Sequence, residues 1–92
     1  MPSLESIAKD PRFIGQTVQS VLKAIGKAYD DHIFVDFTPG KLNAAAFLFE
    51  GDGWIYFHID EFQHQPAFHP ERKWDLDLLL KEKVAQMEFE AE

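Results

Sequence analysis

The sequence predicts an α+β fold, a two-layer α-β-β-β-α domain in which helices pack on a three-stranded antiparallel meander. Two observations support this class. Apolar residues recur at helical spacing in the first and last thirds of the chain, and the middle third holds three runs rich in β-branched and aromatic residues, separated by turn residues. Because 92 residues can bury only one core, we expect residues 1–92 to form a single domain.

The first helices are predicted from their capping residues. A short helix is expected over residues 3–9, with Ser3 as its N-cap. Proline is favoured at the first position of a helix, so Asp10 and Pro11 predict the start of a new helix over residues 11–29.

The helix over residues 11–29 is expected to be amphipathic. We interpret Gly15 and Gly26 as glycines tolerated inside it, at a cost of up to about 1 kcal/mol each. Its apolar stripe comprises Ile14, Val18, Val21, Leu22, Ile25 and Tyr29.

Three strands are expected over residues 32–37, 42–50 and 54–60. Residues 38–41 and 51–53 contain the proline and glycines that are typical of tight turns. The middle of the chain therefore reads as two successive hairpins.

Alternation along the strands predicts which side chains share a face. A three-residue loop at residues 51–53 would pair Phe49 with Ile55 and Phe47 with Phe57 on the core face. An odd first loop would add Ile33 and the other odd-numbered apolar residues of the first strand. The opposite face would then show Phe34, Asp36, Ala44, Ala46, Leu48, Trp54, Tyr56 and His58.

The C-terminal third is expected to be an irregular segment over residues 61–70 and a helix over residues 72–89, with an acidic tail to residue 92. Pro70 or Asp75 could begin this helix. Its two apolar stripes comprise Leu76, Leu79, Leu80, Val84, Met87 and Ala91 on one side and Leu78, Ala85 and Phe89 on the other.

The second face of the sheet is more apolar than a solvated face should be. A helix or the 61–70 segment could cover it, a partner chain could bind it, or Trp54, Tyr56 and His58 could line a small-molecule pocket. We expect a partner, most simply a second copy in a homodimer, because so small a domain gains stability from association. The candidate interface residues are Phe34, Leu48, Trp54, Tyr56, His58, Leu78 and Phe89.

The net charge is −7, divided between +2 over residues 1–29 and −9 over residues 30–92. This balance argues against direct binding of nucleic acid or of an anionic membrane. It allows a basic protein partner. As an alternative function, an acidic inhibitor or nucleic-acid mimic would need one stripe formed by Asp30, Asp31, Asp36, Asp52, Asp60, Glu61, Asp75 and Asp77.

Few residues suggest catalysis. The absence of cysteine excludes thiol chemistry and Cys-ligated metals, and no serine lies in a strand-turn-helix elbow. A small metal-binding protein or enzyme using His58, Asp60, His64 and His69 is a second alternative, although their spacing matches no established ligand pattern. We assign no catalytic residue, metal or cofactor.

No signal peptide or membrane-spanning run is visible, so a cytoplasmic location is expected. Together these observations predict a small acidic protein that is not an enzyme. It would act as an interaction module or regulator, working as a homodimer.

Overall fold

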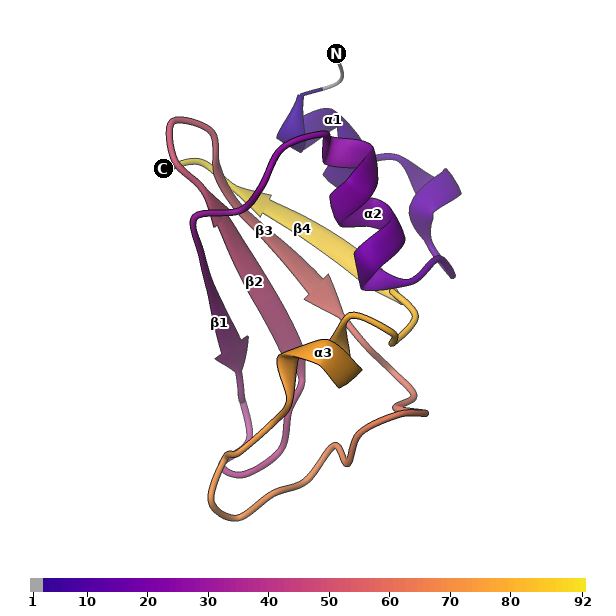
Figure 1. Cartoon of the computed structure of the whole chain (residues 1–92), viewed down its shortest axis with the longest axis vertical. Coiled ribbons are helices and arrows are strands. Elements are labelled where there is room, and N and C mark those ends of the chain that lie inside the picture. The colour runs from indigo at the N-terminus through magenta and orange to yellow at the C-terminus, as the bar shows by residue number, and fades with distance from the viewer. Residues whose placement is uncertain (1–2) are drawn as a thin grey trace.

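The computed structural model describes residues 3–92 and contains a four-stranded antiparallel sheet with short helices on one side (Figure 1). The strands lie in chain order, β1-β2-β3-β4. The elements are α1 (Leu4–Ala8), a 3-10 turn η1 (Pro11–Phe13), α2 (Val18–Ile25), β1 (Asp31–Val35), β2 (Ala44–Phe49), β3 (Gly53–His58), α3 (Leu76–Leu79) and β4 (Gln86–Glu90). The α+β class is confirmed, whereas the three-stranded sheet and the order α-β-β-β-α are wrong.

Two of the predicted helix N-caps lie near the start of the chain. Ser3 caps α1 by accepting a hydrogen bond from the backbone N–H of Ser6 at 3.1 Å. Asp10 accepts from the backbone N–H of Arg12 at 3.0 Å and caps η1, whose first residue is Pro11. The caps are confirmed, but only a single 3-10 turn follows the second one.

The predicted helix over residues 11–29 is wrong in length, since only Val18–Ile25 forms α2. Gly15 adopts a left-handed φ of 89° and breaks the chain direction before Thr17, which caps α2. Gly26, at φ 85°, ends the helix as its C-cap. Both glycines are therefore helix boundaries rather than tolerated interior residues, because glycine adopts positive φ without steric cost.

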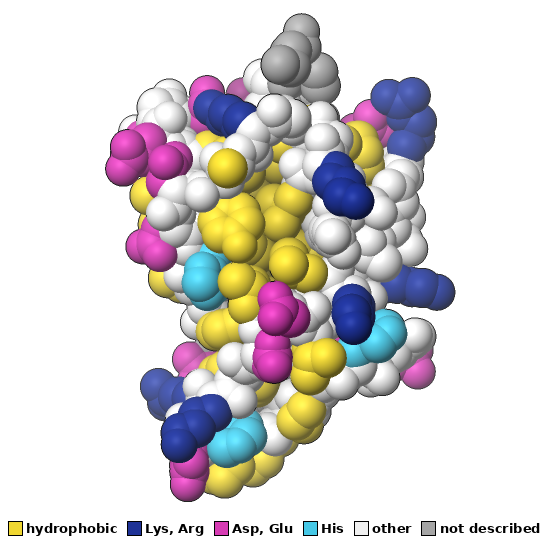
Figure 2. Space-filling view, viewed as in Figure 1, with side chains coloured by type: hydrophobic (Ala, Val, Ile, Leu, Met, Phe, Trp, Pro, Cys, Tyr) yellow, Lys and Arg dark blue, Asp and Glu magenta, His cyan; other side chains and the backbone are white. Residues whose placement is uncertain are grey.

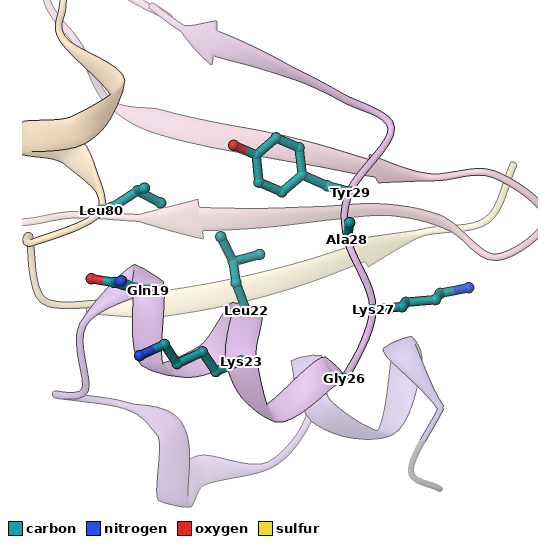
Figure 3. Close-up of a pocket in the computed structure, with 8 residues that line it drawn as sticks. All are labelled: Gln19, Leu22, Lys23, Gly26, Lys27, Ala28, Tyr29 and Leu80. Carbon is teal, nitrogen blue, oxygen red and sulfur yellow. The ribbon is translucent and has the colours of Figure 1, made fainter.

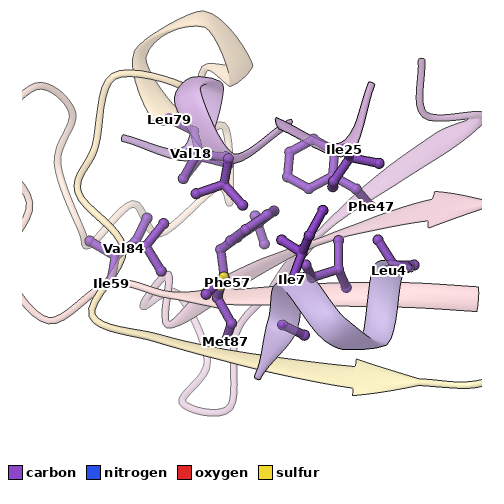
Figure 4. Close-up of a cluster of buried hydrophobic side chains, with 14 of the residues drawn as sticks. Leu4, Ile7, Val18, Ile25, Phe47, Phe57, Ile59, Leu79, Val84 and Met87 are labelled. Carbon is purple, nitrogen blue, oxygen red and sulfur yellow. The ribbon is translucent and has the colours of Figure 1, made fainter. Parts of the chain in front are cut away.

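The core lies between the helices and one face of the sheet (Figure 4). The predicted stripe of α2 contributes Val18, Val21 and Ile25, and α1 contributes Leu4 and Ile7. Opposite them, the sheet and its flanking segments supply Ala45, Phe47, Phe49, Ile55, Phe57, Ile59, Leu79, Val84 and Met87.

The hairpin of β2 and β3 has the predicted faces but a different register. Phe49 pairs with Gly53 and Phe47 pairs with Ile55, so the loop spans residues 50–52 instead of 51–53. Both loops contain three residues. Each residue of β2 therefore pairs with a residue two positions earlier on β3 than predicted, which keeps every side chain on its predicted face. Phe47, Phe49 and Phe57 are fully buried as expected.

The face predicted for β1 is wrong. Val35 pairs with Ala44, which leaves an eight-residue connection over residues 36–43 in place of a three-residue loop. The side chain of Asn43 accepts hydrogen bonds from the backbone of Phe37 and Thr38 within this connection. With an even number of connecting residues, the even-numbered side chains of β1 share a face with the odd-numbered side chains of β2. Phe34 therefore lies opposite Ala45 and faces the core.

The largest error is at the C-terminus, where a helix over residues 72–89 was predicted. Asp75, one of the two predicted starts, caps a helix, but α3 is only one turn long. The chain then runs alongside α2, where the backbone of Val84 exchanges hydrogen bonds of 2.8 Å with Gly15 and Gln16. Residues 86–90 form β4 against the free edge of β3. The strands predicted over residues 32–37 and 54–60 each begin one residue earlier and end two residues earlier, and the strand predicted over residues 42–50 is shortened at both ends.

The segment over residues 61–70 contains no helix or strand, as predicted. It crosses beyond the end of the sheet at which β3 finishes (Figure 1). The backbone of Leu42 donates to the carbonyl of Ala67 at 2.6 Å, which holds the segment against the first connection.

Candidate interaction surface

One face of the sheet lies on the side away from the helices, and we call it the open face. Strand alternation gives this face every second residue, opposite the set that includes Phe47 and Phe57. Figure 1 shows the helices together on the other side of the sheet. The open face consists of Asp31, Ile33 and Val35 on β1, Ala44, Ala46 and Leu48 on β2, Trp54, Tyr56 and His58 on β3, and Gln86, Glu88 and Glu90 on β4.

The pairing arranges these side chains in three rows across the sheet, each with one residue from every strand. The middle row runs Ile33, Ala46, Tyr56 and Glu88. The flanking rows run Asp31, Leu48, Trp54, Glu90 and Val35, Ala44, His58, Gln86. The open face is therefore largely apolar and aromatic over β1, β2 and β3, and acidic along β4.

The centre of the open face is flat because β2 contributes alanines there. Ala44 and Ala46 are fully buried between larger neighbours on β1 and β3. Ile33 is 43% exposed, and Trp54 and Tyr56 are half-buried. Aliphatic side chains on β1 and aromatic side chains on β3 thus flank a shallow centre that a second protein surface could cover.

The aromatic side chains of β3 on the open face, which we call the aromatic column, are Trp54, Tyr56 and His58. They lie beside the acids of β4. The hydroxyl of Tyr56 donates to Glu90 Oε2 at 2.8 Å. This hydrogen bond raises the pKa of Tyr56 above 10.0, with smaller contributions from burial and from the carboxylates of Glu90 and Glu88. The raised pKa favours the neutral hydroxyl, which donates to the carboxylate of Glu90 on β4.

His58 lies at the corner of the open face beside an exposed aromatic ring. Its ring stacks on that of Phe37, with centroids 6.4 Å apart and planes 8° apart. Its Nε2 is 3.5 Å from Glu88 Oε2 and has no hydrogen-bond partner among residues 3–92. Phe37 is 70% exposed, so this stack extends the apolar surface past the end of the strands.

Four of the seven predicted interface residues meet on the open face: Leu48, Trp54, Tyr56 and His58. The placement of Phe34 and Phe89 away from the core is wrong. The rings of Phe34 and Trp74 have centroids 6.0 Å apart, and Phe89 pairs with Ile55. Both phenylalanines pack against the core. Leu78 lies half-buried on α3.

Sequence reasoning missed two apolar residues of the open face, Ile33 and Val35. In β1 apolar residues occupy both odd and even positions (Ile33, Phe34 and Val35), so alternation alone does not choose a face. The choice depends on the length of the connection after the strand. The proposed internal covers are also absent: α2 packs on the other face, and residues 61–70 cross at one end of the sheet (Figure 1).

The acids required for an acidic mimic are spread over the molecule. Asp30 accepts from the backbone of Glu50 at 2.8 Å and Asp52 pairs with Lys27, both at one end of the sheet. Asp36 pairs with Arg72 at 2.9 Å at the other end. Asp75 is used as the cap of α3. These four acids serve local contacts and do not lie along one stripe.

The histidines also lie apart. His58 is on the open face, while His64 lies in the irregular segment over residues 61–70, with its ring Nδ1 2.7 Å from Glu82 Oε1. His69 accepts from the backbone N–H of Glu71 at 3.1 Å. Within residues 3–92 no group of three or more histidines and acids is placed to hold a metal ion.

Comparison of the chain with protein-family models, with curated proteins and with solved structures finds no match in any of the three. No helix within residues 3–92 has the length and apolar character needed to cross a membrane.

Proposed function

We propose that this protein is an interaction module, not an enzyme, and that it forms a homodimer by packing the open face of one copy on that of another. The observation that carries the proposal is the uncovered apolar surface over β1, β2 and β3. The exposed face of an antiparallel sheet is normally polar, and larger apolar patches mark interaction sites.

A second copy fits this surface in shape, because the buried Ala44 and Ala46 keep its centre shallow. Two sheets can pack face to face at a separation of about 10 Å, as in a β-sandwich.

The test is the mass of the protein in solution, measured by light scattering and sedimentation over a range of concentrations. The wild-type chain should approach twice its 10.6 kDa mass at high concentration. Ile33→Glu adds a charge at the exposed edge of the open face and should keep the protein monomeric. Ile14 is a matched control, because it is 45% exposed against 43% for Ile33 but precedes α2 on the helical side.

Circular dichroism should show that both variants keep the wild-type fold. The proposal is contradicted if the wild-type protein remains at its monomer mass at hundreds of micromolar. It is contradicted equally if Ile14→Glu disrupts association as strongly as Ile33→Glu.

A basic protein is the second candidate partner, favoured by the acidic side chains of β4. Glu88 and Glu90 border the aromatic column, so a partner with lysine or arginine around an apolar centre would complement the face. Salt dependence distinguishes this partner from a second copy, as described in the Discussion.

A further inference from the structure

A second surface feature lies on the helical side of the molecule, away from the open face. A groove of about 460 Å³ runs between α2, the segment that follows it and Leu80. Figure 2 shows this side, with apolar side chains gathered between the helices and the sheet and lysines around them. Small-molecule sites usually fall between 300 and 1,000 Å³.

The walls of the groove are apolar and firmly placed. Leu22, Tyr29 and Leu80 converge on it from three different segments (Figure 3). The Tyr29 ring packs edge-on against the buried Phe47 ring, with centroids 4.8 Å apart. A flat apolar group could therefore lie between an aromatic wall and two leucines without rearranging the core.

The polar groups of the groove gather at one end. Gln19 and Lys23, one turn apart on α2, lie on the same side (Figure 3). Lys27 also borders the groove, but it points away and pairs with Asp52. Lys23 forms no ion pair within residues 3–92, so its ammonium group is available to an incoming anion.

We propose that this groove binds a small amphipathic carboxylate, with its flat apolar body between Leu22, Tyr29 and Leu80 and its carboxylate beside Lys23 and Gln19. Charge complementarity selects the anion, because the ammonium group of Lys23, which forms no ion pair within residues 3–92, stands beside the apolar groove. The Gln19 amide supplies a hydrogen-bond donor that a carboxylate can accept.

The experiment titrates the full chain with naphthoate and follows backbone amides by ¹H–¹⁵N NMR. We expect saturable shifts at Gln19, Lys23, Tyr29 and Leu80. Naphthamide has the same apolar body without the charge and should bind more weakly. Lys23→Gln should weaken naphthoate binding roughly fivefold, the effect of about 1 kcal/mol from one partly exposed ion pair.

Lys41→Gln is the matched control, since Lys41 is an exposed lysine in the connection between β1 and β2. It should leave naphthoate binding unchanged. The proposal is overturned if naphthoate produces no saturable shifts, if its shifts lie on the open face, or if naphthamide binds equally well. It is also overturned if Lys23→Gln, with a wild-type spectrum, binds naphthoate as the native chain does.

Discussion

The fully buried carboxylate of Glu82 lies 2.7 Å from the ring Nδ1 of His64, joining the segment after α3 to the irregular segment over residues 61–70. The same carboxylate accepts hydrogen bonds of 2.8 Å from the backbone N–H groups of Gln63 and His64. A single buried side chain therefore holds a stretch that has no regular structure of its own.

Replacing this carboxylate should destabilise the fold. Glu82→Gln keeps the volume but turns an amide N–H₂ toward backbone donors, so we expect a loss of about 2 kcal/mol in the free energy of unfolding. Urea denaturation followed by fluorescence measures the loss. Glu61→Gln, at an exposed position beside the same segment, should change stability by no more than about 0.5 kcal/mol. Equal effects of the two variants would contradict this role of Glu82.

Two glycines of the β2–β3 hairpin should respond differently to alanine. Gly53 has a φ of 131°, and a Cβ there would overlap the backbone carbonyl of Glu90 on β4. We expect Gly53→Ala to cost more than about 2 kcal/mol and to increase hydrogen exchange along β4. Gly51 has a φ of 86° but open space around it, so Gly51→Ala should cost only about 1 kcal/mol. Similar losses in both variants would show that packing against β4 is not the cause.

Tyr56 should titrate above its ordinary pKa of 10.0, because its hydroxyl donates to Glu90. The folded-state pKa is raised, so this stabilising contribution is present below pH 10.0 and is lost as the pH rises through the higher folded value. In a Tyr29→Phe background, ultraviolet absorbance follows Tyr56 alone. Glu90→Gln should shift the titration midpoint back toward 10.0. A midpoint unaffected by this change would contradict the assigned cause.

Salt should distinguish the two candidate partners of the open face. Each copy of the chain carries a charge of −7, so a homodimer must overcome mutual repulsion that salt screens. We therefore expect its association constant to rise between low and high salt in sedimentation experiments. A complex with a basic partner would weaken over the same range. A homodimer that dissociates as salt is added would contradict an interface centred on apolar residues.

Local sequence signals predicted those features that depend on neighbouring residues in the chain. Ser3 and Asp10 are predictable as caps, and Asp75 as one of two candidate helix starts, because a short polar side chain before a helix satisfies its free N–H groups. The alternation in β2 and β3 fixed which side chains are buried, even though the register moved by one pair. These features gave the α+β class and four residues of the open face.

The sequence contained two further signals whose meaning was ambiguous. Gly15 and Gly26 could be helix interiors or boundaries, and only their positive φ values decide that they are boundaries. Residues 86–90 alternate strictly between polar and apolar, a strand pattern, yet Met87 also fits a helical stripe. A segment this short can satisfy both the alternation of a strand and the spacing of a helix.

The tertiary structure decided these ambiguous cases through contacts distant in sequence. Residues 86–90 became a strand because β3 offers an unpaired edge and because Met87 and Phe89 then reach the core. β1 turned Phe34 inward, where Trp74 packs against it, and turned Ile33 and Val35 outward. By itself, the sequence determined capping, alternation, composition and charge, since these act between near neighbours. Which edge β4 joins and which face of β1 stays open are set by long-range packing and by the length of a connection, which no local period contains.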